Sequence, residues 1–111
     1  MGTNYKVLGQ RQGTAALATY ATLYTVPAST GTIISSISIC NTQTTDYRFR
    51  IAIGTTATPA AANWIAYDSY AAANDTSFIT VSLCMDTTYS YLIISSENAG
   101  LSFTACGSET T

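Results

Sequence analysis

The chain has 111 residues, of which 47% are hydrophobic and only 9% are charged, with four basic and six acidic side chains and no histidine. This length fits one domain, residues 1–111, with a single hydrophobic core. Four cations are too few to follow a nucleic-acid backbone, and the lack of histidine excludes Ser-His-Asp and Cys-His catalysis. The sequence holds no run of about 20 apolar residues, so we expect no membrane partner. The start of the chain lacks the apolar stretch of a signal peptide, which predicts synthesis in a cytoplasm.

Short runs rich in Val, Ile, Tyr, Phe and Thr recur about every twelve residues, with turn-forming residues between them. In chain order these runs are residues 6–10, 19–26, 32–41, 47–53, 64–70, 78–85, 89–95 and 101–105. Their spacing predicts an all-β fold, an antiparallel β-sandwich or jelly roll of about eight strands. No segment keeps an apolar period of 3.6 residues, so little or no helix is expected.

The run 47–53 is the clearest strand, because its odd positions are apolar while Arg48 and Arg50 share the opposite face. Ile33, Ile37 and Ile39 fall on one face of the run 32–41 by the same alternation. Side chains on the apolar side of each strand form the predicted core, which consists of Val7, Ile37, Ile39, Phe49, Ile51, Ile53, Ile79, Val81, Leu83, Ile93, Leu101 and Phe103.

The three cysteines, Cys40, Cys84 and Cys106, are odd in number and widely spaced. Together with the missing signal peptide, this pattern argues against a disulfide framework, so we interpret all three as free, small, buried hydrophobes. Without histidine or a close cysteine pair, no zinc site is expected. The glycines stand singly at turns rather than in a phosphate-binding loop, so no cofactor is predicted.

Paired carboxylates are the one catalytic arrangement that spacing leaves conceivable, with Asp68 and Asp75 as candidates beside Trp64, Tyr67 and Tyr70. Asp75 is better explained as a turn former, and we expect no enzyme. The same aromatic residues raise the alternative of a sugar-stacking platform. On a regular strand Trp64 and Tyr67 point to opposite faces, which favours packed tyrosines with exposed hydroxyl groups instead.

The low charge content favours a surface that is partly covered by other subunits, since interface cores are depleted of charge. Five side chains are therefore candidates for a partner interface: Lys6, Gln10, Arg11, Arg48 and Arg50. Arg48 and Arg50 are interpreted either as part of a solvated face or as anchors for a partner's carboxylates.

Several residue combinations follow one another along nearly the whole chain, namely Lys6–Gln10, Leu23–Ala28, Ser36-Ile37 with Cys40-Asn41, Phe49–Ala52, Ile65–Asp68, Ala73–Thr76 and Leu101–Phe103. In order and spacing they resemble a group of small virion proteins of tailed bacteriophages, including phages of cyanobacteria. The resemblance implies a β-sandwich module on the particle, commonly a capsid decoration (cement) protein that assembles as a trimer. It carries no catalytic residues.

That resemblance implies the major capsid protein as a partner, the capsid surface of the virion as the location, and production in the host cytoplasm. Within this interpretation, residues 1–11 are expected to form an N-terminal arm that binds the shell. Two alternatives stay open, a tail, fibre or baseplate module of the phage particle and a carbohydrate-binding β-sandwich module.

Overall fold

The structure, a computed structural model, describes residues 2–111 apart from the side chain of Val81, so this predicted core residue lies outside the description. The described residues form eight strands: β1 (Thr3–Gln12), β2 (Ala21–Thr25), β3 (Gly31–Asn41), β4 (Tyr47–Gly54), β5 (Trp64–Ala71), β6 (Asp75–Met85), β7 (Tyr91–Ser96) and β8 (Leu101–Thr110). None of the described residues belongs to a helix that could cross a bilayer. The predicted all-β class and strand number are confirmed.

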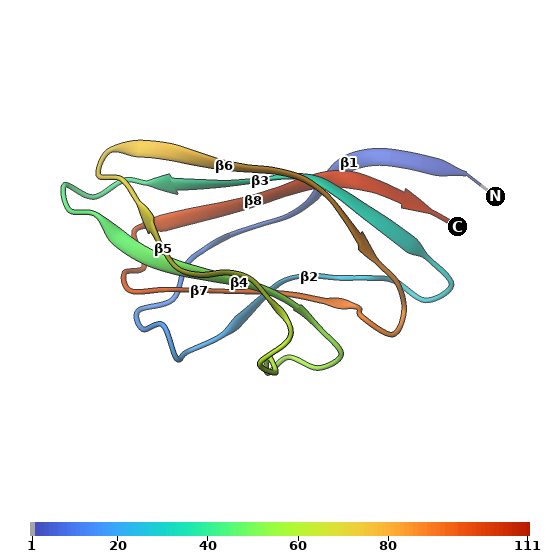
Figure 1. Cartoon of the computed structure of the whole chain (residues 1–111). Helices are drawn as coiled ribbons and strands as arrows, with labels where there is room; N and C mark the ends of the chain where they lie inside the picture. The colour runs from blue at the N-terminus through green and yellow to red at the C-terminus, as the bar shows by residue number, and fades with distance from the viewer. Residues whose placement is uncertain (1) are drawn as a thin grey trace.

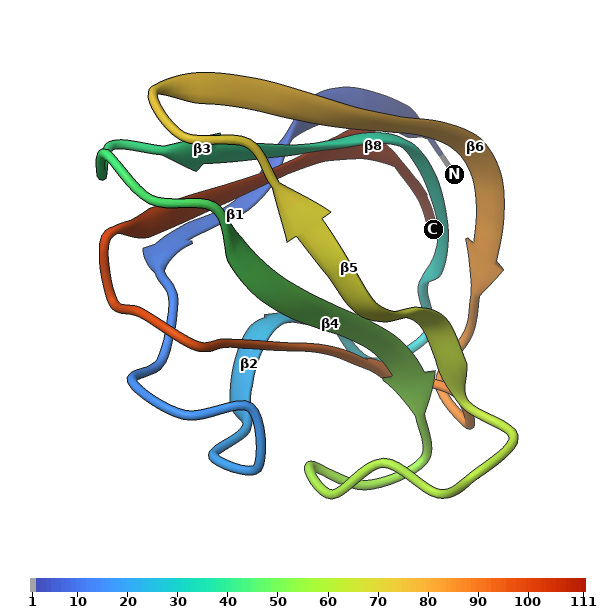
Figure 2. The same cartoon turned by 60° about the vertical axis from the view of Figure 1, so that its left-hand side comes forward.

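The strands form two four-stranded antiparallel sheets that pack face to face (Figures 1 and 2). Sheet A has the order β1-β8-β3-β6, and sheet B has the order β2-β7-β4-β5. Successive strands pass from one sheet to the other, except at β4 and β5, which are neighbours in sheet B. Eight strands in this order make a jelly roll, so the predicted sandwich takes the jelly-roll form.

The hydrophobic core lies between the two sheets and is centred on Phe49 of sheet B and Phe103 of sheet A. Their ring centroids are 6.2 Å apart in an edge-to-face arrangement. The predicted core positions that are confirmed as buried in this cluster are Ile37, Ile39, Phe49, Ile51, Leu101 and Phe103. Three others are half-buried against it, namely Ile53, Ile79 and Leu83.

Two β-bulges change the side-chain alternation on which the core prediction depended. The pairing of β1 with β8 shifts between Val7 and Gly9, and Val7 is 53% exposed, so its assignment to the core was wrong. The pairing of β3 shifts between Ile34 and Ser36, and there Ile34 is buried while Ile33 is 48% exposed. A bulge adds one residue to a strand, which reverses the side-chain pattern on one side of it.

Strand β7 lies between β2 and β4 and is buried from Leu92 to Ser96. Ile93 is buried as predicted, but its neighbours Leu92 and Ile94 are the β7 residues in the core cluster. The two faces of this strand are both covered, so hydrophobicity along it does not alternate and the sequence could not say which face points inward.

Candidate functional site

Aromatic and charged side chains gather on the outer face of sheet B around Arg50. The Arg50 guanidinium carbon lies 4.1 Å from the ring centroid of Tyr67 and 5.7 Å from that of Trp64. Arg50 Nε also donates a 2.6 Å hydrogen bond to Asp68 Oδ1, and the ring of Tyr20 lies 5.9 Å from that of Trp64. We call Tyr20, Arg50, Trp64, Tyr67 and Asp68 the arginine–aromatic cluster.

Trp64 and Tyr67 lie on the same side of β5, with ring centroids 4.9 Å apart, so the prediction of opposite faces was wrong. The cause is a break in the strand. The pairing between β4 and β5 shifts between Ile51 and Ala52, whose partners are Ala66 and Trp64, so one step along β4 matches two along β5. A second shift lies opposite Arg50, where Asp68 adopts a left-handed backbone conformation with φ of 53°. The first shift brings Trp64 to the same side of β5 as Tyr67, and at the second the Asp68 carboxylate accepts the hydrogen bond from Arg50.

The cluster does not form the flat platform that stacks against a sugar ring. The rings of Trp64 and Tyr67 are inclined by 74°, and those of Tyr20 and Trp64 by 52°. The guanidinium of Arg50 covers one face of Tyr67 in a cation–π contact. The cluster therefore packs the outer surface of sheet B.

The two arginines of β4 have carboxylate partners within the chain. Arg48 Nη2 lies 2.8 Å from Glu97 Oε2, and Arg50 Nε lies 2.6 Å from Asp68 Oδ1. The hydrogen bond from Arg50 lowers the pKa of Asp68, and that from Arg48 lowers the pKa of Glu97. A contact of either arginine with a partner stays a prediction, and such a contact would have to compete with these carboxylates.

The carboxylate pair considered for glycoside hydrolysis lies on two different sheets. Asp68 belongs to β5 of sheet B, whereas Asp75 begins β6 of sheet A and its Oδ1 accepts a 2.8 Å hydrogen bond from the Thr76 amide. A general acid needs a raised pKa, but the contact with Arg50 lowers that of Asp68. Sequence spacing could not reveal either feature.

The segment expected as an N-terminal arm is the edge strand of sheet A. Residues from Thr3 to Gln12 pair with β8, which corrects the expectation of a free arm, while Met1 lies outside the described residues. Gln10 Nε2 donates to Thr104 Oγ1 at 3.3 Å, and Arg11 Nε donates to the Gln12 carbonyl at 3.1 Å. The role of these side chains in partner binding stays a prediction.

Lys6, the remaining candidate, belongs to a polar network that joins the two sheets. Its Nζ lies 2.8 Å from Glu109 Oε1, and Glu109 also accepts a hydrogen bond from the Tyr24 hydroxyl of β2. Burial and the bond to Glu109 raise the pKa of Tyr24 to about 12. The hydrogen bond from Lys6, and to a smaller extent that from Tyr24, lowers the pKa of Glu109. The network therefore keeps a neutral tyrosine and an ionised carboxylate together.

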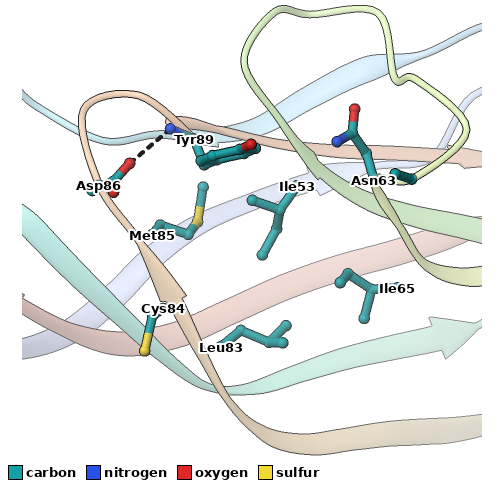
Figure 3. A pocket seen from close by; sticks show the side chains of 9 residues that line it. Ile53, Asn63, Ile65, Leu83, Cys84, Met85, Asp86 and Tyr89 are labelled. Atoms are coloured by element: carbon teal, nitrogen blue, oxygen red, sulfur yellow. Dashed lines mark hydrogen bonds between the residues drawn. The ribbon is translucent and has the colours of Figure 1, made fainter.

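A pocket of about 430 Å³ opens between the edge strands β5 and β6 (Figure 3). Its lining is mainly apolar and includes Ile53, Ile65, Leu83, Met85 and Tyr89. Two of the side-chain oxygens there accept hydrogen bonds within the chain, Asp86 Oδ1 from the Tyr89 amide at 2.7 Å and Asn63 Oδ1 from the Ala60 amide. No group of three or more metal-ligating side chains occurs in the part of the chain that the structure describes.

No family model matches the chain, and no curated protein matches it. Among solved structures, a chain of infectious bursal disease virus, Gx strain, aligns with a TM-score of 0.50 and 15% identity over 97% of this chain. A chain of the T13 particle of the same virus aligns with a TM-score of 0.50 and 14% identity over 96% of this chain.

This chain covers only 30% of the length of each of those two viral chains. At such low identity the likeness concerns the fold. The protein is therefore a jelly-roll β-sandwich of the kind found in viral particle chains, and its own role is a separate question.

Proposed function

We propose that this protein is a structural component of a virion, and that it is a capsid decoration (cement) protein of a tailed bacteriophage. The observation that carries the proposal is the jelly-roll fold of this chain, which aligns over nearly its whole length with chains of a virus. The residue combinations from Lys6 to Phe103 that resemble phage virion modules support it independently.

A decoration protein acts by burying surface across neighbouring capsid subunits, which requires no catalytic group. A stable contact of this kind buries at least about 1,000 Å² in total. Many copies on one shell then multiply a modest affinity through avidity. A decoration protein needs a rigid domain. Here the arginine–aromatic cluster packs the outer surface of sheet B, and the polar network around Glu109 joins the two sheets.

Within this proposal, the strand β1 contacts the shell through Arg11. Arg11 is exposed on the edge strand and, among the described residues, donates to the carbonyl oxygens of Gln12 and Thr22. Its charge is thus available to a shell carboxylate, unlike that of Arg48, which is paired with Glu97.

Immunogold labelling of purified virions with an antibody against this protein tests the proposal, and we expect gold on the heads. Labelling confined to tails would instead identify a tail, fibre or baseplate module, and unlabelled virions would refute a virion role. In a pelleting assay with capsids that lack the protein, Arg11→Ala should weaken binding at least tenfold. The matched change Arg48→Ala should leave binding within about twofold.

A further inference from the structure

The outer face of sheet A is built from residues that lie side by side in rows across all four strands. Directly paired residues of antiparallel strands point to the same face, so the registers define each row. From one end of the sheet to the other the rows are Tyr5-Ser108-Ile33-Cys84, Val7-Cys106-Ser36-Thr80, Gln10-Thr104-Ser38-Phe78 and Gln12-Ser102-Cys40-Thr76. We call these residues the uncharged face.

None of these residues carries a charge, although the outer surface of a sandwich is normally where charges lie. The charged residues of sheet A belong instead to the alternating rows on the other side, where Lys6 pairs with Gly107, Arg11 with Phe103, and Glu109 with Thr32. The outer face of sheet B differs as well, since it carries Arg48, Arg50 and Asp68.

Four large apolar side chains of the uncharged face are exposed to solvent. The exposed fraction is 69% for Tyr5, 53% for Val7, 48% for Ile33 and 69% for Phe78. They lie near the edges of the sheet or at one end, while Ser, Thr and Cys side chains occupy the middle of β3 and β8. The small side chains in the middle leave room for the bulkier side chains of an opposing sheet.

We propose that the uncharged face is a self-association surface on which a second copy of this chain packs, sheet A against sheet A. Strands of about ten residues at 3.3 Å each, four abreast at about 4.8 Å, give a face of about 33 Å by 19 Å. Two such faces bury roughly 1,200 Å² together, which exceeds the approximately 1,000 Å² of a stable interface.

The lack of charge on the face favours a second copy as the occupant. Any partner that covers this face with a charged group leaves that group desolvated and unpaired, which is costly. The same face on another copy carries no charged group at any of these positions. Hydroxyl and amide groups of the two copies can then form hydrogen bonds with each other. The arrangement is isologous with a two-fold axis in the plane between the sheets, so it gives a dimer rather than the trimer that the resemblance implies.

All three cysteines are free, as predicted, but the prediction that they are buried was wrong, since Cys84 is exposed and Cys40 and Cys106 are half-buried. They lie on the uncharged face, so the native protein carries its own reporters. Light scattering of the purified full chain at about 100 µM should give the mass of a dimer. Under reducing conditions, maleimide labelling of Cys106 should be at least tenfold slower than in a dilute monomeric sample. A monomer at that concentration, a trimer, or a dimer with unprotected Cys106 would each overturn the proposal.

A charge placed on the face should separate the two copies without unfolding either. Thr80 is exposed on β6 in the row of Cys106, and Thr80→Lys should raise the dimer dissociation constant at least tenfold and restore labelling. The matched control Thr55→Lys makes the same change in the exposed β4–β5 loop, which lies beyond sheet B (Figure 2), and should leave the dimer unchanged.

Circular dichroism and thermal unfolding of both variants establish that each is folded before its mass is compared. Equal dimerisation of a folded Thr80→Lys variant would exclude this face as the interface. Neither measurement uses a capsid, so the pairing of two copies can fail or hold independently of the proposed virion role.

Discussion

Replacement of Asn41 by alanine tests whether a buried amide holds one end of the sandwich together. Asn41 ends β3, is 1% exposed, and its Nδ2 donates 2.9 Å hydrogen bonds to the carbonyls of Thr45 and Ala71. Its Oδ1 accepts a further 2.9 Å bond from the Gln43 amide. One side chain thereby fixes the turn after β3 and ties it to the end of β5.

Three hydrogen bonds at about 1 kcal/mol each predict that Asn41→Ala lowers the free energy of unfolding by about 3 kcal/mol. Asn41→Asp should be at least as destabilising at pH 7, because a carboxylate would then face the carbonyls of Thr45 and Ala71. Urea unfolding followed by Trp64 fluorescence, at one low protein concentration, measures both changes.

Asn4→Ala is the matched control, since Asn4 is exposed on β1, and it should change stability by no more than about 0.5 kcal/mol. A loss below about 1 kcal/mol for Asn41→Ala, or an equal loss for Asn4→Ala, would refute the reasoning.

The other two predictions concern the core and the network around Glu109. Phe103→Ala removes a fully buried ring and should lower the free energy of unfolding, measured in urea, by about 3–5 kcal/mol. Phe78→Ala, at a 69% exposed position, should lower it by about 0.5 kcal/mol or less. Similar losses for the two variants would contradict the assigned faces. The pKa of Glu109 is lowered from 4.5 in the folded state, so its stabilising effect is complete above that value and is lost as pH falls through the folded pKa. Thermal unfolding of Glu109→Gln from pH 7 to 3 should therefore show a smaller loss of stability than the unsubstituted protein, and identical pH profiles would disprove the coupling.

The sequence alone determined the fold class and most of the strands. Alternation of apolar and polar residues depends only on the two-residue period of a strand, so the run around Phe49 and Ile51 could be assigned to the core directly. Ile37 and Ile39 near the end of β3, and Leu101 and Phe103 at the start of β8, were assigned to the core in the same way. Composition also predicts that the chain does not bind nucleic acid, because that argument needs only the count of cations, and this stays a prediction.

Sequence reasoning failed where the backbone leaves regular geometry. The bulges beside Val7 and Ile34 and the register shift between Trp64 and Ala66 each reverse the side-chain pattern on one side of them. Gly9 is a local signal for the first of them, since an isolated glycine in a strand often marks a bulge. The local residue pattern does not mark the other two, because a bulge is fixed by the pairing with a neighbouring strand. The same cause placed Tyr67 beside Trp64 and turned an expected pair of opposite faces into one cluster.

Only the tertiary structure decided which residues form a site. The uncharged face joins side chains of β1, β3, β6 and β8, which are far apart in sequence and meet because the jelly-roll order makes them neighbours. Likewise, Arg48 and Arg50 were visible in the sequence as two basic residues on one face, but the carboxylates that neutralise them come from β5 and the segment after β7. A local pattern shows which face a residue takes within its strand, whereas strand order and register determine what lies beside it.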